Sequence, residues 1–268
     1  MINKNVLFIG AGNMGEGILK GALTKKVLAK ENISFYEVLE ERLNYIKSTY
    51  AIKSLASLTV GIDADILIIA VKPQDINSVL EKIKANSNKN CIVVSIAAGI
   101  SIGQIENILG EQRKIVRVMP NPLCESGFGI TALCPNSQVS EGEFEDVKSI
   151  FQAIGEITVI KERLFDAFTG FSGSGGAFVF EFIEAMIEAG VYVGFSASQS
   201  ALFATQNIMG AAKMMMDTKK HPALFKERIS SPAGTTIAGL HVLNKSGFKG
   251  IIQECVKAAA DRSKELGK

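Results

Sequence analysis

Residues 6–21, VLFIGAGNMGEGILKG, are the stretch that decides the fold. Four apolar residues, Val6–Ile9, run directly into a turn with the pattern G-x-G-x-x-G, and so short an apolar run is typical of a strand buried on both faces. The turn consists of Gly10, Ala11, Gly12, Asn13, Met14 and Gly15. Apolar residues then recur at helical spacing, at Ile18, Leu19, Ala22 and Leu23. The stretch therefore predicts a strand, a tight turn and a helix.

The three glycines of this turn each have a physical reason if the turn binds a dinucleotide. Gly10 permits the sharp turn, Gly12 lets the backbone approach a pyrophosphate, and Gly15 lets the helix lie close to the strand. The helix start then offers N–H groups to the phosphates. The alternative is a plain structural turn. We favour a dinucleotide site, because a second apolar run, residues 33–36, ends at Glu37, where the dinucleotide fingerprint expects an acidic residue.

The composition is that of an ordinary globular protein. The chain has 268 residues, 47% hydrophobic and 21% charged, which suffices for one large domain or two modest ones. Its net charge is +2 without a basic stripe, so we expect neither a nucleic acid nor a membrane surface as partner. Four scattered cysteines and two distant histidines form no metal pattern. Because the first strand begins by residue 6, we expect no cleavable targeting segment, and a cytoplasmic protein.

Short apolar runs alternate with helical spacing up to about residue 160. Further strands are expected at residues 66–71, 91–96, 115–119, 128–133 and 157–160. This alternation predicts a Rossmann-type, doubly wound and mostly parallel α/β sheet. Ligands of such sheets bind at the carboxyl ends of the strands. Besides the glycine-rich turn and Glu37, the expected cofactor-binding residues are therefore Ala70, Val71, Lys72, Pro73, Ala97, Ala98, Gly99, Met119 and Asn121.

The strand signals stop at Arg163, and most of the remaining sequence is helical. We therefore expect a dinucleotide-binding domain over residues 1–161 and a helical domain for substrate binding and dimerisation over residues 162–268. The most apolar helix, residues 177–195, is interrupted by three glutamates, which argues against a membrane span. It needs cover on most of its surface, and we expect a second copy of the chain to supply that cover.

Two small-residue motifs in the helical half are candidate substrate sites. The first, residues 170–176, is either a flexible connector or a tight turn where backbone meets cofactor or substrate, with Gly173, Ser174 and Gly175 at its centre. The second, residues 230–236, predicts Ser231 as an N-cap and Pro232 at the first helical position. The free N–H groups of that helix start suit a carboxylate. Gly234, Thr235 and Thr236 are weak helix formers, and a helix cap alone does not require them. We therefore favour a substrate site.

The motifs of this chain, in the order in which they occur, resemble those of the pyrroline-5-carboxylate reductase family. The resemblance covers essentially the whole chain. The motifs are residues 10–15, 70–73, 95–99, 117–121, 173–175, 210–214, 221–222 and 231–236, of which the last, with its Pro-x-Gly-Thr-Thr core, is the most specific. The chain departs from the usual family pattern at Ala233, Gly176, Phe178, Pro122 and Lys219, where Gly, Pro, Tyr, Thr and Glu are common.

The resemblance implies an activity and an assembly. Such enzymes reduce the cyclic imine 1-pyrroline-5-carboxylate to L-proline with NADPH or NADH, in the last step of proline biosynthesis. Their helical domains interlock into dimers, often assembled into decamers. The substrate carboxylate lies on the Pro-x-Gly-Thr-Thr helix start, here Ser231, Gly234, Thr235 and Thr236. We expect Thr236 to be the catalytic residue, as the hydrogen-bond partner that orients the imine nitrogen.

Two rival functions share this domain plan. The glycine spacing at Gly170, Gly173 and Gly175 resembles a motif of the β-hydroxyacid dehydrogenases. However, Val179 stands where those enzymes have a lysine. Alcohol oxidation needs a proton acceptor, whereas imine reduction does not need that lysine. A non-catalytic dinucleotide sensor is the other rival, and the departures from the family pattern are its only support.

Glu37 predicts a preference for NADH over NADPH. A carboxylate at this position can accept hydrogen bonds from the adenosine ribose, and it would repel a 2′-phosphate. The segment continues with two further glutamates and Arg42. Arg42 could neutralise a phosphate, and an outward-pointing Glu37 is the alternative.

Overall fold

The computed structural model describes residues 1–59 and 61–267, and these divide into two compact units. Unit 1 comprises residues 1–173 together with residues from 259 onward, and unit 2 comprises residues 174–258. The division between the compact units, after Gly173, thus lies later in the sequence than the domain boundary that we expected after residue 161. It also returns the end of the last helix to unit 1. The expected functional boundary stays a prediction.

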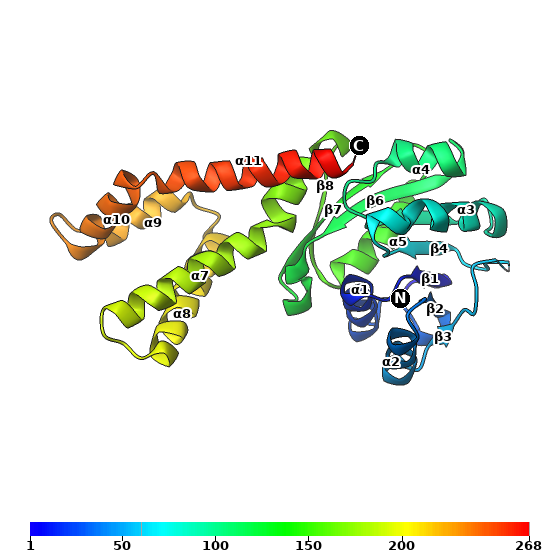
Figure 1. Cartoon of the computed structure of the whole chain (residues 1–268), viewed down its shortest axis with the longest axis horizontal. Coiled ribbons are helices and arrows are strands. Elements are labelled where there is room, and N and C mark those ends of the chain that lie inside the picture. Colours follow the sequence, from blue (N-terminus) through cyan, green and yellow to red (C-terminus); the bar gives the residue numbers. More distant parts are fainter. Residues whose placement is uncertain (60, 268) are drawn as a thin grey trace. The chain divides into compact units, whose positions relative to one another are not determined.

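Unit 1 is built on one sheet of eight strands (Figure 1). The strands are β1 (Val6–Ile9), β2 (Ile33–Tyr36), β3 (Lys53–Ser54), β4 (Ile66–Ile69), β5 (Ile92–Ser95), β6 (Lys114–Pro120), β7 (Gly129–Pro135) and β8 (Gly155–Val159). Their order is β3-β2-β1-β4-β5-β6-β7-β8, and β6–β7 is the one antiparallel pair among the described strands. The predicted doubly wound, mostly parallel sheet is confirmed. Strand β3, only two residues long, was not predicted.

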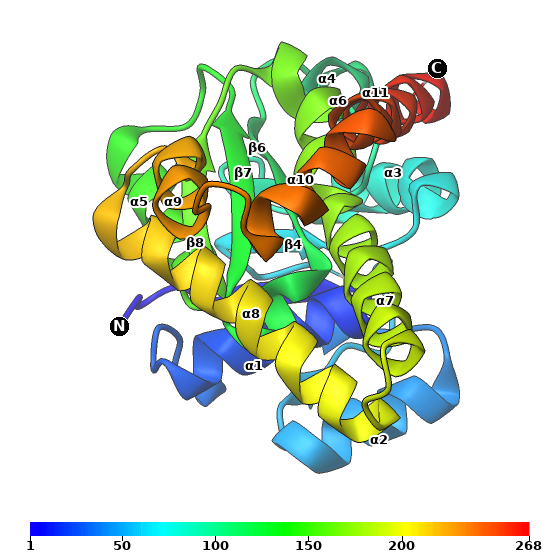
Figure 2. The same cartoon turned by 90° about the vertical axis from the view of Figure 1, so that its left-hand side faces the viewer.

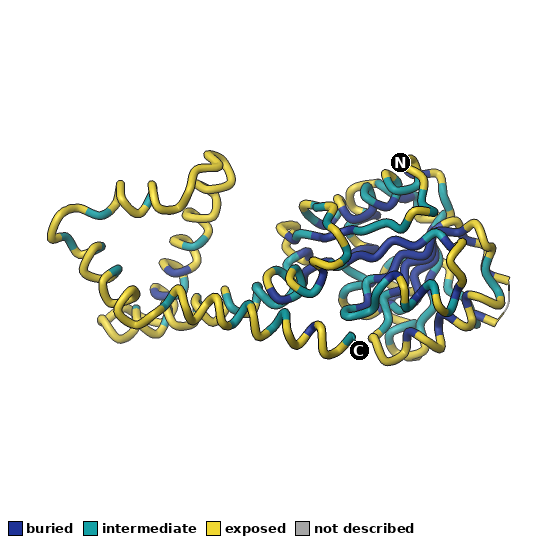
Figure 3. The backbone as a smooth tube through the Cα atoms, turned by 90° about the horizontal axis from the view of Figure 1, so that it is seen from above, coloured by how far each residue is buried: buried dark blue, intermediate teal, exposed yellow. Residues whose placement is uncertain are grey.

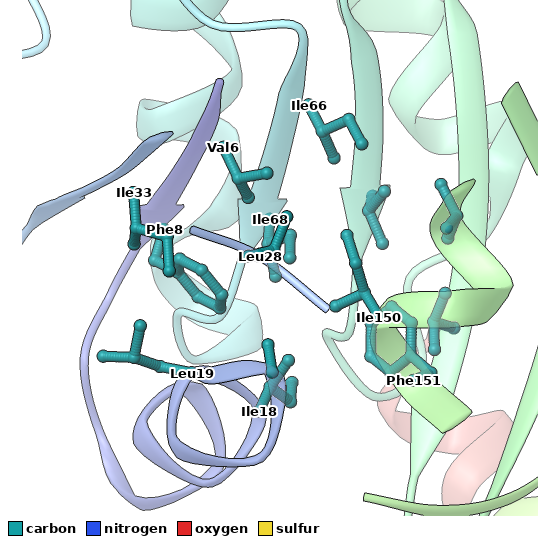
Figure 4. Packing of buried hydrophobic residues seen from close by; sticks show 14 of the residues in the cluster. Val6, Phe8, Ile18, Leu19, Leu28, Ile33, Ile66, Ile68, Ile150 and Phe151 are labelled. Atoms are coloured by element: carbon teal, nitrogen blue, oxygen red, sulfur yellow. The ribbon is translucent and has the colours of Figure 1, made fainter. Parts of the chain in front are cut away.

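Helices cover both faces of this sheet. They are α1 (Asn13–Thr24), α2 (Glu40–Tyr50), α3 (Ile76–Asn86), α4 (Ile102–Leu109), α5 (Glu141–Gln152) and the short α6 (Phe165–Phe168). The 3-10 turns η1 (Lys30–Asn32), η2 (Pro73–Asp75), η3 (Pro122–Ser126) and η4 (Glu162–Leu164) and a π-helix, η5 (Thr169–Gly173), complete the unit. Helices α1, α2 and α5 bury apolar side chains with Val6 and Phe8, whereas α3 and α4 pack with Leu7 and Ile9. Figure 4 shows the first of these cores, with Ile18 and Leu19 of α1 beneath the strands.

The first turn of α4 is capped by side chains. The Ser101 hydroxyl accepts a hydrogen bond from the Gln104 N–H at 3.2 Å, and the Gln104 Oε1 accepts one from the Ser101 N–H at 2.7 Å. Together they form a capping box, which satisfies donors that have no partner inside the helix.

Unit 2 is helical throughout, as predicted. It contains α7 (Gly175–Tyr192), α8 (Ala197–Thr218), α9 (Pro222–Ile229), α10 (Thr235–Lys245) and the first part of α11 (Phe248–Leu266). Helices α7 and α8 lie side by side (Figure 2). Aromatic pairs join α7 to α11, through Phe182 and Phe248, and the α7–α8 connection to α8, through Phe195 and Phe203.

The helices of unit 2 leave most of their apolar side chains exposed. No residue of α7 is buried, and in Figure 3 the helices of unit 2 are mostly exposed while the strands of unit 1 are mostly buried. Phe180 is 62% exposed and Tyr192 is 92% exposed. Across the described residues, no helix combines the length and apolar character needed to cross a membrane.

The predicted start of α10 is wrong by one turn. Ser231 does not cap the helix and Pro232 is not its first residue, since α10 begins at Thr235 with Gly234 as N-cap. The reason is Ala233, whose φ of +55° lies in the left-handed region and cannot belong to a right-handed helix. The Gly234 N–H instead donates to the Ser231 carbonyl at 3.1 Å, which closes a separate turn.

Candidate functional site

The glycine-rich turn after β1 has the geometry that its glycines suggested. Gly10 has φ +90°, and a Cβ there would lie 2.6 Å from the Ala70 carbonyl oxygen. A Cβ on Gly15 would lie 2.6 Å from the Gly10 carbonyl oxygen. Any side chain at either position would push α1 or β4 away from the turn, which supports the roles assigned to these two glycines.

The first turn of α1 fits a dinucleotide pyrophosphate. Gly12 is the N-cap residue of α1, and it has no side chain that could bond to the free N–H groups. The first helical bond runs from the Glu16 N–H to the Gly12 carbonyl at 2.9 Å. The N–H groups of Asn13, Met14 and Gly15 therefore have no partner within the helix. A Cβ built on Gly12 meets no atom within 4 Å, so the space in front of these donors is open. Donors, helix dipole and open space together suit an anionic phosphate.

Two cavities in unit 1 share Gly12 and Asn13. One, of about 630 Å³, continues toward β2 and α2 and is lined by Gly12, Asn13, Glu37, Leu39, Glu40, Glu41, Arg42 and Tyr45. The other, of about 360 Å³, extends toward β4, β5 and β6. It is lined by Gly12, Asn13, Met14, Ala70, Val71, Lys72, Pro73, Ile96, Ala97, Ala98, Met119, Pro120, Pro122 and Gly173. We name them the Glu37 cavity and the Met119 cavity. Since the acidic residue after the second strand is expected to bind the adenosine ribose, we expect the nicotinamide on the side of the Met119 cavity.

Most of the predicted cofactor residues therefore come together at one edge of the sheet. Gly10 and Glu37 line a smaller neighbouring cavity of about 210 Å³ together with Val71. Ala11, Gly15, Gly99 and Asn121 do not line either of the two larger cavities.

The Glu37 carboxylate is held by three backbone N–H groups. Its Oε2 accepts from Ala11 at 2.8 Å, and its Oε1 accepts from Val38 at 2.8 Å and from Leu39 at 3.0 Å. A carboxylate has about four acceptor positions, so one remains for a ligand hydroxyl. Glu37 thus ties the glycine-rich turn to the end of β2 in addition to lining the cavity.

Arg42 is engaged within the protein. Its Nε donates to the Ala11 carbonyl, and its Nη2 forms an ion pair with the Glu16 carboxylate. The hydroxyls of Tyr45 and Tyr50 donate to the same carboxylate, at 3.1 and 2.7 Å. Burial raises the pKa of Glu16, but the hydrogen bonds from Tyr50, Arg42 and Tyr45 outweigh burial and leave the pKa below its ordinary value. Burial, reinforced by the bond to Glu16, raises the pKa of Tyr50. Sequence reasoning missed this network, since no motif joins α1 to α2.

Asn121 is buried and joins three elements. Its Oδ1 accepts from the Ile130 N–H of β7 at 3.2 Å, and its Nδ2 donates to the Ser172 hydroxyl of η5 at 3.3 Å. Gly173 follows directly, and a Cβ on it would lie 3.1 Å from the terminal methyl of Met119. The Asn121 amide therefore holds the π-helix, a feature frequent at functional sites, against the Met119 cavity.

The two small-residue motifs lead into helices of unit 2. Ser174 is the N-cap residue of α7, and Gly175 is its first residue. At α10 the N–H groups of Thr235, Thr236 and Ile237 have no partner within the helix, because the first helical bond runs from Ala238 to Gly234. Thr236 is partly buried and Thr235 is exposed. Free donors of this kind suit a carboxylate, with Gly234 in place of Ser231 as the cap, and the substrate site stays a prediction.

Comparisons with known proteins agree along the whole chain. A family model described as pyrroline-5-carboxylate reductase dimerisation matches residues 162–266, and one described as NADP oxidoreductase, coenzyme F420-dependent, matches residues 5–99. A pyrroline-5-carboxylate reductase of Methanosarcina acetivorans is 38% identical, with 100% of both chains covered.

Solved structures show the same relationship. The pyrroline carboxylate reductase of Plasmodium falciparum, solved with NADP bound, is 34% identical with a TM-score of 0.90. The pyrroline-5-carboxylate reductase of Coxiella burnetii is 30% identical with a TM-score of 0.92, and both comparisons cover 100% of each chain. The resemblance read from the motifs is thereby confirmed. With a nicotinamide dinucleotide as its class of cofactor, this chain belongs to the pyrroline-5-carboxylate reductase family.

Proposed function

We propose that this protein reduces 1-pyrroline-5-carboxylate to L-proline. The observation that carries the proposal is the start of α10, where three unpaired N–H groups and two threonine hydroxyls suit a small carboxylate. The dinucleotide crevice of unit 1 supplies the second requirement of the reaction. Val179, where a hydroxyacid dehydrogenase would carry a lysine, lies in α7 and has no proton to exchange.

The protein's part in this reaction is binding and orientation. A bound reduced nicotinamide would supply a hydride from its C4 to the carbon of the protonated imine, so the nitrogen of the product already carries its proton. The N–H groups of Thr235, Thr236 and Ile237 hold the carboxylate of the substrate, and the Thr236 hydroxyl orients the imine nitrogen. Met119, Val71 and Pro73 give the Met119 cavity apolar walls, against which a nicotinamide ring can pack. No side-chain nucleophile is required.

A steady-state assay tests the proposal. With 1-pyrroline-5-carboxylate and NADH, we expect dinucleotide oxidation, followed by absorbance, to match proline formation mole for mole. A panel of cyclic imino acids of different ring size measures how strictly the substrate is selected. A protein that binds NADH and turns over none of these substrates is the sensor alternative, and that result would contradict the proposal.

We further propose that NADH is preferred over NADPH. Glu37 lines the cavity on the ribose side and keeps one acceptor position for a ribose hydroxyl. Arg42, the cation of that segment, already pairs with Glu16 and bonds to Ala11. A 2′-phosphate would therefore face a carboxylate whose neighbouring cation is taken.

The assembly and the cellular location are argued from the dimerisation region and from the cysteines. The chain carries the family's dimerisation region, so it forms homo-oligomers. A decamer stays a prediction, which sedimentation velocity would test. The four cysteines are all free thiols, which supports our expectation of a reducing, cytoplasmic environment.

A further inference from the structure

The end of α11 returns to unit 1 and contacts the turn after β5. We call residues 259–267 the return segment. The Gln104 Nε2 of α4 donates to the Gly267 carbonyl at 3.0 Å. A Cβ on Gly267 would lie 2.5 Å from the Gly99 carbonyl oxygen, and one on Gly99 would lie 3.2 Å from the Gly267 nitrogen. The two backbones are thus in direct contact, with no room for a side chain between them.

A second contact fixes the return segment nearby. The Ser263 hydroxyl is buried and donates to the Asp166 Oδ1 of α6 at 2.7 Å. Helix α6 also carries Phe165, whose ring lies under the Arg117 guanidinium at 4.6 Å, and Arg117 forms an ion pair with Glu162 at 3.0 Å. The segment therefore rests on two fixed points, one at α6 and one at the turn.

The turn that Gly267 touches forms part of the cofactor crevice. Ala97 and Ala98 line the Met119 cavity, and Gly99, with φ +78°, reverses the chain directly behind them. The next residues lead into the capping box of Ser101 and Gln104. Gln104 consequently serves two purposes with two atoms. Its Oε1 caps α4, and its Nε2 holds the return segment.

We propose that the return segment positions the Ala97–Gly99 turn against the nicotinamide half of the cofactor, with Gln104 and Gly267 as positioning residues. The proposal rests on the dinucleotide site of the proposed function. The segment contacts the turn at Gly99, which does not line the Met119 cavity, so its loss leaves the cavity wall in place but no longer fixed. Binding on the nicotinamide side then weakens, because part of the binding energy must restore the turn.

The decisive variant is Gln104→Glu. It keeps the Oε1 acceptor of the capping box, where Glu is also a common residue, and removes the Nε2 donor to Gly267. The matched control is Gln199→Glu in α8, which changes the same residue in the same kind of box with Ser196. Gly267→Ala is the second variant, since its methyl group displaces Gly99 while leaving Gln104 untouched.

The readout is the affinity for two ligands, NADH and ADP-ribose, which lacks the nicotinamide. NADH binding is followed by its fluorescence, and ADP-ribose by competition against it. For Gln104→Glu and Gly267→Ala we expect the Kd of NADH to rise about threefold to tenfold, the loss expected for one hydrogen bond. The Kd of ADP-ribose should stay unchanged, and Gln199→Glu should change neither constant.

Two outcomes would overturn the proposal. Unchanged NADH affinity in both variants, even with a lower melting temperature, would show that the return segment only stabilises the fold. A parallel loss of ADP-ribose affinity would place the effect on the whole crevice. The Kd of NADH and the Kd of ADP-ribose do not depend on turnover. A protein that bound NADH without reducing the imine would therefore contradict the proposed function, while this test could still be interpreted.

Discussion

Unit 1 and unit 2 both contain helices with apolar faces, but they bury these faces differently. In unit 1, Phe8 of β1 is 1% exposed and Ile18 of α1 is fully buried, because sheet and helices enclose each other within one chain. In unit 2, Phe180 of α7 and Met209 of α8 are 62% and 59% exposed. A sheet gives each helix a broad face to pack on, whereas two paired helices cover only a narrow stripe. Unit 1 thus closes its own core, and we propose that unit 2 completes its core with a second copy.

The largest effect is expected from breaking that assembly. The double variant Phe180→Glu/Met209→Glu places two charges on the exposed apolar surface of unit 2. Losing two buried side chains costs about 3–6 kcal/mol, so the dissociation constant of the dimer should rise at least about a hundredfold. Sedimentation equilibrium at micromolar concentration measures this. Phe128→Glu, on a side chain of unit 1 that is 78% exposed, is the control and should leave the assembly intact. A wild-type monomer would refute the comparison itself.

The next effect separates the chemistry of the two units. Thr236→Ala removes a hydrogen bond to a charged substrate, worth about 1.5–3 kcal/mol, and should lower kcat/KM by about 10- to 150-fold. NADH affinity should hardly change, since the glycine-rich turn belongs to unit 1. Thr205→Ala is the control, because its hydroxyl bonds only to carbonyls of its own helix. Unaltered activity, or an equal loss of NADH binding, would argue against Thr236 as a substrate contact.

A change at Glu37 in unit 1 should have the converse effect: it should alter the preference between the two cofactors and leave substrate binding unchanged. We expect the wild type to favour NADH over NADPH by about tenfold in kcat/KM, close to 1.4 kcal/mol, and Glu37→Ser to narrow that gap. Glu37→Gln distinguishes charge from hydrogen bonding, because it keeps one acceptor oxygen and removes the charge. Kinetics with both cofactors measure the preference. A wild type that prefers NADPH would contradict the role of Glu37 without touching the reductase assignment.

The smallest effect concerns the acid stability of unit 1. Burial raises the pKa of Glu143, but the bonds from Lys114 and Ser140 outweigh burial and lower the pKa to about 2. The group therefore stabilises the fold above its unfolded pKa of about 4.3, and this contribution is lost as the pH falls toward 2. Between pH 7 and pH 3, the wild type should lose about 1 kcal/mol more stability than Glu143→Gln. Urea unfolding at both pH values measures it, with Glu145→Gln of an exposed pair as the control. Equal losses in the wild type and Glu143→Gln would contradict the assignment.

The sheet could be predicted because its signals are local. A strand such as Ile66–Ile69 is apolar at every position, and such runs are buried on both faces of a parallel sheet. Strand β3 has only two residues, too few for a periodicity, and therefore escaped prediction. The start of α10 was wrong because a single left-handed residue, Ala233, separates the proline from the helix.

The candidate site could be predicted only in part. Its backbone elements follow from glycine and strand-end patterns, and Gly12, Ala97 and Met119 indeed lie together along the crevice. The bonds between side chains of distant segments could not be read in this way. Glu37 lies at the predicted place, but its bond to the Ala11 N–H spans 26 residues. The Asn121 amide reaches η5 across 51 residues. Contacts of this kind arise from tertiary packing and leave no periodic trace in the sequence.

The return segment also has a consequence for the order of folding. Unit 1 is discontinuous in sequence, since residues 174–258 separate its first part from residues 259–267. During synthesis, β1 to β8 emerge first, and at about 5–20 residues per second the ribosome needs several more seconds to complete the segment that rests on Gly99. Throughout that interval the nascent chain has its sheet but lacks the contact behind the Ala97–Gly99 turn. The cofactor crevice is therefore the last part of the sheet unit to reach its final form, after all the helices of unit 2 have been made.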